Sequence, residues 1–494
     1  MLFTRNVFAV SLLVAIAFSC SGFAQDTFTW TGTAGDSDWN NAANWGGAGD
    51  FPGLGDTAVF ESDATASGGS VTNFNNSANF LLDGQNDVNQ ISIADGGVIN
   101  NSGNITFAVD GFTTDSSGNV DIILPGNEFF ADTNNPDELP LGTVNQFFQI
   151  NGEAVLQGTG VVDLRGTLTG FRGSTGSVLE NNSTIRVSPI QELENGNTVG
   201  GGTISGLEFR NRNLIEVDDS ILIFANTSFD NSGGVLAANP NSDNIPSLID
   251  ITSQSELSGG VLRSFSNGLP ISDADDPDTR SFPSLNVAGI LRDVELEGNW
   301  DLNGFSFTDS RGSRGTIEGE ITNNGSVQVV TSISTNGNVT FSGTGNFDLL
   351  DDGSAFSSTT ILDGLNTSQV LNDVGHTITG NGGVLQRMEL ENRGTIIAEN
   401  SFLELDDVSL NSTGTLLARD SGVLRQNGGD VTATSIDIET GGAYDLNSGR
   451  LEVEQFNGSF FQDGGTFSPG IGVGSTNITG DYTLRSNATL EIEN

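Results

Sequence analysis

The segment Asn392-Arg-Gly-Thr-Ile-Ile-Ala398 is followed, 20 residues further along the chain, by Ser412-Thr-Gly-Thr-Leu-Leu-Ala418. Glycine, threonine, a branched apolar residue and alanine recur at equivalent positions of the two segments. Repeats of this length are typical of stacked arrays, in which each unit buries its apolar face only against its neighbours. About 20 residues are enough for one coil of a β-helix, so the spacing predicts a β-solenoid.

The same interval recurs more faintly elsewhere, where it sets Ile215 against Val235 and Val217 against Ala237. The chain reads as strand-like runs of three to five residues, such as Thr184–Val187, separated by Asn, Gly and Asp. Beyond the N-terminal apolar run, no segment has the i, i+3, i+4, i+7 spacing of an amphipathic helix. We therefore predict an all-β fold, a right-handed parallel β-helix of roughly 20 coils and on the order of 100 Å in length, with rows of Phe, Val and Ile inside.

The N-terminus has the pattern of a secretory signal peptide. Arg5 precedes the apolar run Val7–Phe18, which is too short to span a bilayer as a helix, and small residues at Gly22 and Ala24 favour cleavage between Ala24 and Gln25. A lipoprotein, with Cys20 as the first mature residue, is the alternative, although Ala17-Phe18-Ser19 is a poor lipobox. We expect a secreted protein at the outer cell surface, with no transmembrane segment in the mature chain.

The composition narrows the function further. The chain has 63 acidic and 17 basic residues, all of the basic ones arginine, and a net charge of −46. Such a charge repels nucleic acid and anionic membranes and attracts cations, so we expect no nucleic-acid partner. Cleavage after Ala24 removes Cys20, the only cysteine, so the mature chain has no disulfide and no thiolate chemistry.

Three of the four tryptophans, Trp30, Trp39 and Trp45, lie near the start of the mature chain. The open end of a β-helix exposes apolar surface and unpaired strand edges, so we expect residues 25–62 to form a Trp-rich cap over one end. The same rings are also candidates for a sugar platform, which requires exposed, coplanar indoles. The sequence leaves both interpretations open.

Motifs near both ends suggest a family. They are Trp30-Thr-Gly32, Asp38-Trp39-Asn40, Asn44-Trp45, Pro52 and Gly55–Phe60 near the start, and Phe467–Gly470, Ile478–Thr483 and Ala488–Glu493 near the end. Their order resembles that of secreted bacterial surface proteins with autotransporter-type, passenger-like β-helix repeats. The resemblance implies an adhesion or surface-layer role without a cofactor. No segment that could form an outer-membrane barrel follows, so we expect the C-terminus to be truncated.

Two polar, proline-containing stretches interrupt the coil pattern, at about residues 126–142 and 267–286, and we interpret them as loop insertions. Asp273, Asp275, Asp276 and Asp278 in the second stretch are candidate calcium ligands, because hard cations prefer carboxylate and carbonyl oxygens. Tandem calcium-binding nonapeptides and EF-hand loops do not occur in the sequence. Calcium is therefore the one cation that we consider, and we expect no other cofactor.

Some β-helix proteins are polysaccharide lyases or hydrolases, so the inventory of catalytic groups matters. The chain has no lysine, and its single histidine, His376, lies in a Gly/Thr-rich run that we expect on the coil surface. The doublets Asp218-Asp219, Asp351-Asp352 and Asp406-Asp407 could supply the two carboxylates of glycoside hydrolysis, but adjacent strand residues point to opposite faces. We therefore assign no catalytic residue.

The sequence predicts a signal peptide over residues 1–24, a Trp-rich cap over 25–62 and a β-helix repeat region over 63–494. The predicted function is a secreted structural or adhesion scaffold without catalytic activity, whose partners are extracellular polysaccharides or surface proteins. A carbohydrate-binding module and a β-helix polysaccharide lyase or hydrolase are the alternatives.

Overall fold

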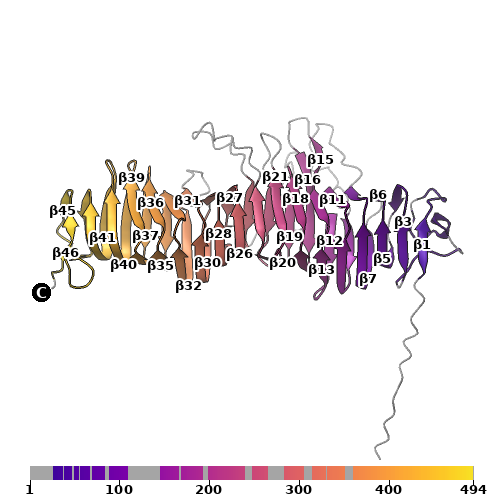
Figure 1. Cartoon of the computed structure of the whole chain (residues 1–494), viewed down its shortest axis with the longest axis horizontal. Helices are drawn as coiled ribbons and strands as arrows, with labels where there is room; N and C mark the ends of the chain where they lie inside the picture. Colours follow the sequence, from indigo (N-terminus) through magenta and orange to yellow (C-terminus); the bar gives the residue numbers. More distant parts are fainter. Residues whose placement is uncertain are drawn as a thin grey trace, which may run out of the picture.

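The computed structural model describes residues 26–36, 38–46, 49–54, 56–66, 69–83, 88–108, 145–165, 169–192, 198–239, 247–264, 283–304, 314–329, 331–350 and 360–492. These residues form a long rod of stacked β-coils, with the strands across the rod and the hydrogen bonds along it (Figure 1). The fold is a parallel β-helix, as the repeat predicts. Two pairings among the described strands are antiparallel: β1 with β2 (Trp45–Gly46), and β15 (Pro189–Glu192) with β16.

Each coil contributes strands to three parallel ladders, and several long strands bend across a corner to join two of them. The first ladder contains β1 (Thr27–Trp30), β3 (Thr57–Phe60), β5 (Ser70–Asn76), β7 (Val88–Asn101), β10 (Glu153–Gln157), β13 (Val178–Asn181), β17 (Glu208–Asn211), β20 (Ser228–Asp230), β23 (Glu256–Ser258), β26 (Ile290–Glu297), β28 (Thr316–Asn323), β30 (Ile333–Ser342), β32 (Ile361–Asn372), β34 (Gly383–Gln386), β37 (Phe402–Asp406), β40 (Val423–Ile438), β41 (Ala443–Asn457), β42 (Phe460–Gln462) and β45 (Tyr482–Leu484).

The second ladder contains β4 (Ala64–Ala66), β6 (Asn79–Asp83), β8 (Asn104–Ala108), β11 (Val161–Arg165), β14 (Thr184–Val187), β18 (Leu214–Asp218), β21 (Val235–Asn239), β24 (Val261–Ser264), the later parts of β26, β28, β30 and β32, then β35 (Glu389–Asn392), β38 (Ser409–Ser412), parts of β40 and β41, β43 (Thr466–Pro469) and β46 (Thr489–Leu490).

The third ladder begins with the first residues of β5 and β7. It continues with β9 (Asn145–Ile150), β12 (Thr169–Gly173), β16 (Thr198–Ser205), β19 (Ile221–Ala225), β22 (Leu248–Ile251), β25 (Ser284–Val287), β27 (Asn299–Asn303), β29 (Ser326–Val329), β31 (Asn346–Leu350), β33 (Thr377–Asn381), β36 (Thr395–Glu399), β39 (Thr415–Arg419), the last residues of β40 and β41, and β44 (Asn477–Ile478).

The structure adjusts two predicted boundaries. Strands β1 and β3, which lie within the segment that we assigned to the cap, already belong to the first ladder. Ser284 to Asn286, at the end of the second predicted loop, form the start of β25. The remainder of that loop, like the core of the stretch at 126–142, lies outside the described residues. A short 3-10 turn, η1 (Ala42–Asn44), precedes β2.

The register confirms the clear repeat and corrects the faint one. Thr395 pairs with Thr415, as the interval of 20 residues predicts. Ile215, however, pairs with Leu236 rather than with Val235. The corner between β20 and β21 holds one residue more than the corner between β17 and β18, and Gly233 adopts a φ of 84° there. A glycine accommodates this left-handed conformation without a steric penalty, so the extra residue is absorbed in the corner and both strands keep their apolar side chains inside.

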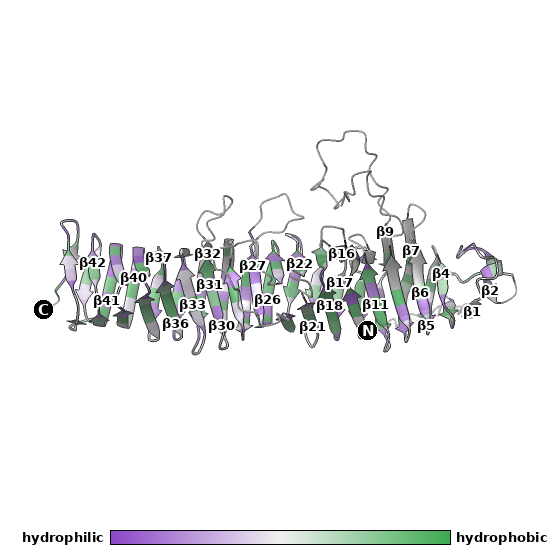
Figure 2. Cartoon of the chain, turned by 90° about the horizontal axis from the view of Figure 1, so that it is seen from above, coloured by the Kyte–Doolittle hydropathy of each residue, from purple (hydrophilic) through white to green (hydrophobic). Residues whose placement is uncertain are grey.

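One continuous apolar core fills the described part of the rod. Alternation along each strand sends every second side chain inward, which Figure 2 shows as alternating hydrophobic and hydrophilic residues. Phenylalanines form an internal row in which Phe148, Phe171 and Phe209 follow one another with ring centroids 6.0 and 6.1 Å apart. Burying a Phe side chain stabilises a fold by about 1.5–3 kcal/mol, so such rows hold neighbouring coils together.

Buried amide side chains form two internal stacks at the corners. Asn181 donates from Nδ2 to Oδ1 of Asn211, and Asn211 donates in turn to Asn231, both at 2.8 Å. The second stack lies at the end of the second-ladder strands, where Asn372 donates to Asn392 at 2.7 Å and Asn392 to Ser412 at 2.9 Å. A buried amide is costly unless it is hydrogen-bonded, and each of these amides satisfies the next, so the stacks specify one register between coils.

The arginines form ion pairs on the outside of the rod. Arg212 Nη2 lies 2.6 Å from Asp230, one coil further along, and Arg292 lies 3.1 Å from Glu256. Within the described ranges every arginine contacts a carboxylate or, for Arg172 and Arg425, lies over a phenylalanine ring. Since acids outnumber arginines nearly fourfold, the outer surface keeps a large negative excess.

Candidate functional site

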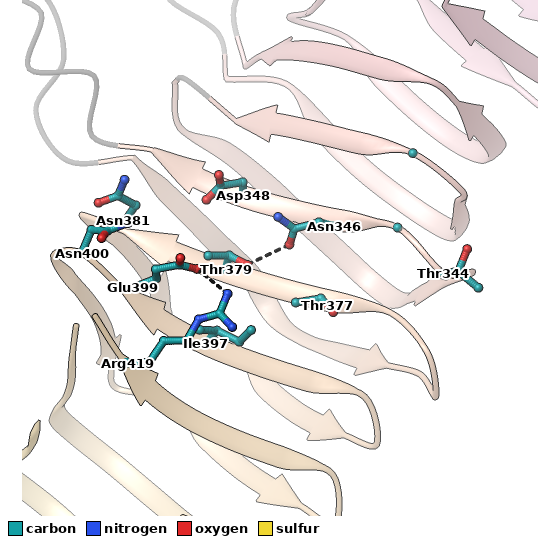
Figure 3. Close-up of a pocket in the computed structure, with 12 residues that line it drawn as sticks. Thr344, Asn346, Asp348, Thr377, Thr379, Asn381, Ile397, Glu399, Asn400 and Arg419 are labelled. Carbon is teal, nitrogen blue, oxygen red and sulfur yellow. Dashed lines mark hydrogen bonds and ion pairs between the residues drawn. The ribbon is translucent and has the colours of Figure 1, made fainter. Parts of the chain in front are cut away.

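A groove with a volume of about 540 Å³ lies on the outer face of the third ladder, over β31, β33, β36 and β39 (Figure 3). In each of these strands alternate side chains enter the core, and the remaining ones line the groove. The parallel register sets Asp348 of β31 opposite Thr379 of β33, and Thr379 opposite Ile397 of β36. Thr379 and Ile397 are short beside their neighbours Gln328 and Arg419, which leaves the hollow between the walls.

The groove is lined mostly by polar groups with defined partners. Thr379 Oγ1 donates to Oδ1 of Asn346 at 2.9 Å, which orients both side chains. On the opposite side Arg419 Nη2 donates to Oε2 of Glu399, also at 2.9 Å. This hydrogen bond is the main reason why the pKa of Arg419 is raised. The guanidinium is therefore occupied by Glu399, as the dashed line in Figure 3 marks.

Asp348 differs from the other groups of the groove. Burial penalises its charged form and, with a smaller contribution from the negative charge of Glu399, raises its pKa to about 6. Its Oδ1 atom is buried and accepts no hydrogen bond from the described residues. At neutral pH the groove therefore holds a carboxylate with no cation beside it. Asp348, Glu399 and Arg419 together leave one negative charge uncompensated.

The predicted tryptophan cluster exists, but its rings are buried. The exposed fractions of Trp30, Trp39 and Trp45 are 6%, 0% and 3%. Trp45 meets Trp30 and Trp39 edge to face, with centroids 4.9 and 4.8 Å apart, and all three pack on Phe60 of β3. A sugar platform requires exposed, coplanar rings, and this arrangement has neither property.

The two described aspartate doublets lie at the ends of strands. Asp218 and Asp406 are the last residues of β18 and β37, and Asp219 and Asp407 follow them with positive φ angles of 44° and 55°. Aspartate tolerates the left-handed conformation better than most residues, so the second member of each doublet forms the corner. Neither doublet lies in the groove, and Asp351-Asp352 lies outside the described residues.

His376 is where the sequence analysis was wrong. We expected it on the coil surface, but its side chain is fully buried, 5.8 Å from the ring of Phe341 and stacked on it. The neighbouring coils have glycines at the equivalent positions, Gly345 and Gly394, as the register of the following residues shows. These two glycines leave room for an imidazole to point inward.

Several other predicted sites cannot be placed. The cleavage site Ala24/Gln25 and the calcium candidates Asp273, Asp275, Asp276 and Asp278 lie outside the described residues. Within the described ranges, no three His, Cys, Asp or Glu side chains are grouped closely enough to hold a metal ion. No helix in that part of the chain is long and apolar enough to cross a membrane.

Sequence analysis did not identify Asp348, Glu399 and Arg419 as neighbours. They come from three different coils, and the distance between Asp348 and Thr379 along the chain does not match the 20-residue repeat. Only the register of the third ladder brings them to one face. A local motif could not have revealed the groove, because no two of these residues lie within the same strand.

Comparisons with known proteins add no name to this geometry: no protein-family model, curated protein or solved structure matches the chain.

Proposed function

We propose that the protein is a secreted, non-catalytic scaffold of the outer cell surface, with a structural or adhesive role. The observation that carries this proposal is the continuity of the rod: three parallel ladders and one apolar core run through its described length. The nineteen strands of the first ladder, at roughly 4.8 Å per step, correspond to about 85 Å. A stiff rod of that length is suited to spacing or presenting a surface.

The side chains that could do chemistry are largely engaged in holding the rod together, which supports the same proposal. The single histidine is buried in a corner stack, and the described arginines are paired with acids or lie on aromatic rings. The excess of carboxylates on the outside keeps such a rod soluble and repels anionic polymers. The N-terminal apolar run, which has the form of a signal peptide, favours secretion.

We further propose that the tryptophan cluster closes the N-terminal end of the rod. Trp30, Trp39 and Trp45 pack on Phe60, in the second strand of the first ladder. The indole of Trp39 donates to Pro52 O at 3.1 Å, and that of Trp45 to Trp39 O at 2.7 Å. A lid of this kind covers the apolar cross-section that would otherwise promote end-to-end association.

A polysaccharide hydrolase is the second candidate, and one observation favours it. Glycoside hydrolysis needs a carboxyl group with a raised pKa and a second carboxylate nearby. Asp348, whose pKa is raised to about 6, shares a groove with Glu399. The ion pair of Glu399 with Arg419 counts against this role, since it occupies the second carboxylate.

One screen separates these functions. The mature chain, residues 25–494, is incubated with acidic and neutral polysaccharides, with and without calcium, and both binding and depolymerisation are measured. The scaffold proposal expects no cleavage product. A product that disappears in Asp348→Asn and Glu399→Gln would establish the hydrolase instead. Labelling of intact cells with antibodies against the mature chain tests the location, and labelling only after lysis would contradict it.

A further inference from the structure

The groove over β31, β33, β36 and β39 points beyond a passive scaffold. We propose that it binds a protonated primary amine carried by a small polyol or alkyl ligand, and that Asp348 receives the ammonium group. The proposal concerns this groove alone, and it stands or falls independently of the scaffold proposal.

The charge of the groove selects the sign of the ligand. Arg419 neutralises Glu399 through a hydrogen bond of 2.9 Å, whereas Asp348 has no cation beside it. One negative charge is left over, in a hollow where burial makes that charge costly. A cationic ligand removes this cost, a neutral ligand does so only in part, and an anionic ligand increases it.

The hydrogen-bonding groups select the kind of cation. An ammonium group is a compact donor of three hydrogen bonds and needs acceptors around it. Asp348 Oδ1 is an acceptor without a partner among the described residues, and it faces the side of the groove where Thr379 and Asn381 lie (Figure 3). A guanidinium is planar and prefers two parallel acceptors, which a single free carboxylate oxygen does not offer.

The floor of the groove limits the rest of the ligand. Ile397 contributes an apolar surface beside the hydroxyl group of Thr379. An alkyl chain or the apolar face of a sugar ring can lie on such a floor while its amine reaches Asp348. The chain itself has no lysine, so no lysine ammonium of its own can occupy the site.

The experiment uses saturation-transfer difference NMR on the mature protein at pH 7.5 and 150 mM salt, which screens weak attraction to the acidic surface. The probes are glucosamine, 1,5-diaminopentane and N-acetylglucosamine. We expect glucosamine or the diamine to bind, and N-acetylglucosamine, which lacks the positive charge, to bind at least tenfold more weakly. Whichever amine binds more tightly identifies the body of the ligand as polyol or alkyl.

Two variants tie the signal to the groove. Asp348→Asn keeps the shape of the side chain and removes its charge, so we expect at least tenfold weaker amine binding. Asp437→Asn is the matched control, because Asp437 lies on the same outer row of the third ladder, beyond Leu417, and outside the groove. It should bind the amine as the unmodified protein does. Equal losses in both variants, no loss in Asp348→Asn, or equal binding of N-acetylglucosamine would each overturn the proposal.

Discussion

Nδ1 of His376 lies 2.7 Å from Oδ1 of Asn372 inside the rod, where the imidazole continues a stack of amides. Asn372 donates from Nδ2 to Asn392 at 2.7 Å, so its oxygen faces the histidine as an acceptor. Nδ1 must therefore carry the proton. Nε2 is left as an acceptor and faces the amide nitrogen of Asn323 at 3.4 Å. The stack is satisfied only by a neutral imidazole with this one tautomer.

The first prediction is that protonation of His376 destabilises the protein. Burial lowers its pKa from 6.5 to about 4, so the unfolded chain binds this proton before the folded one does. The corresponding stability is complete above pH 6.5 and is lost as the pH falls toward 4, by about 3 kcal/mol at pH 4.

The measurement for His376 is denaturant unfolding at pH 7 and pH 4 for the unmodified protein and for His376→Asn. The variant loses packing at both pH values, but it should lack the histidine's share of the pH dependence. Because the carboxylates titrate in both proteins, the difference between the two isolates this residue. An identical drop in stability in both proteins would show that His376 does not titrate as proposed.

The second prediction concerns the corner stack at Asn211. Replacing this residue by alanine removes the partner of both Asn181 and Asn231 and leaves buried polar atoms unsatisfied. We expect a loss of about 2–4 kcal/mol in the free energy of unfolding. Asn447→Ala is the control, because Asn447 donates to Asn427 at 2.8 Å in an exposed pair and should lose less than about 0.5 kcal/mol. Similar losses at the two sites would mean that burial of the stack is unimportant.

The third prediction is that Asp348→Asn stabilises the protein at neutral pH. The pKa of Asp348 is raised from 3.8 to about 6, so the folded state binds this proton more tightly than the unfolded chain and is penalised once the proton is lost. Above pH 6 the variant avoids a penalty on the order of 1–3 kcal/mol. Thermal unfolding of both proteins at pH 7.5 and pH 4 is the test. The gain should be present at pH 7.5 and largely absent at pH 4, and a pH-independent change would contradict the assignment.

The fold was accessible from the sequence because stacking enforces repetition. Ile396 and Leu416 occupy equivalent positions in neighbouring coils, so each must be apolar and the 20-residue interval becomes visible. Where a corner gains a residue, as at Gly233, the interval shifts and the sequence pattern misplaces the pairing by one position. Strands tolerate no such shift, because it would turn their apolar side chains outward.

The candidate site was not accessible for a related reason. Outward-facing positions carry no packing requirement, so nothing in the repeat marks Asp348 as different from other exposed acids. Its environment depends on Thr379 and Glu399, which other coils supply. His376 was misplaced because its local sequence resembles a surface corner, whereas the glycines that make room for it, Gly345 and Gly394, lie in neighbouring coils.

The last prediction tests the lid at the N-terminal end. Trp39 and Trp300 are both fully buried, and each indole donates to a backbone carbonyl, at 3.1 Å to Pro52 and 3.2 Å to Glu297. Trp300 lies in β27, in the middle of the rod, whereas Trp39 packs on the first coils. Replacing either residue by alanine should cost about 3–5 kcal/mol.

Only Trp39→Ala, however, should expose apolar surface at the end of the stack. We therefore expect this variant to self-associate as its concentration rises, as measured by sedimentation velocity, while Trp300→Ala stays monomeric at matched loss of stability. Association of both variants would point to general destabilisation and remove the argument for a lid. Because the two substitutions delete the same side chain at the same burial, a difference between them can arise only from the position in the rod, at its end or in its middle.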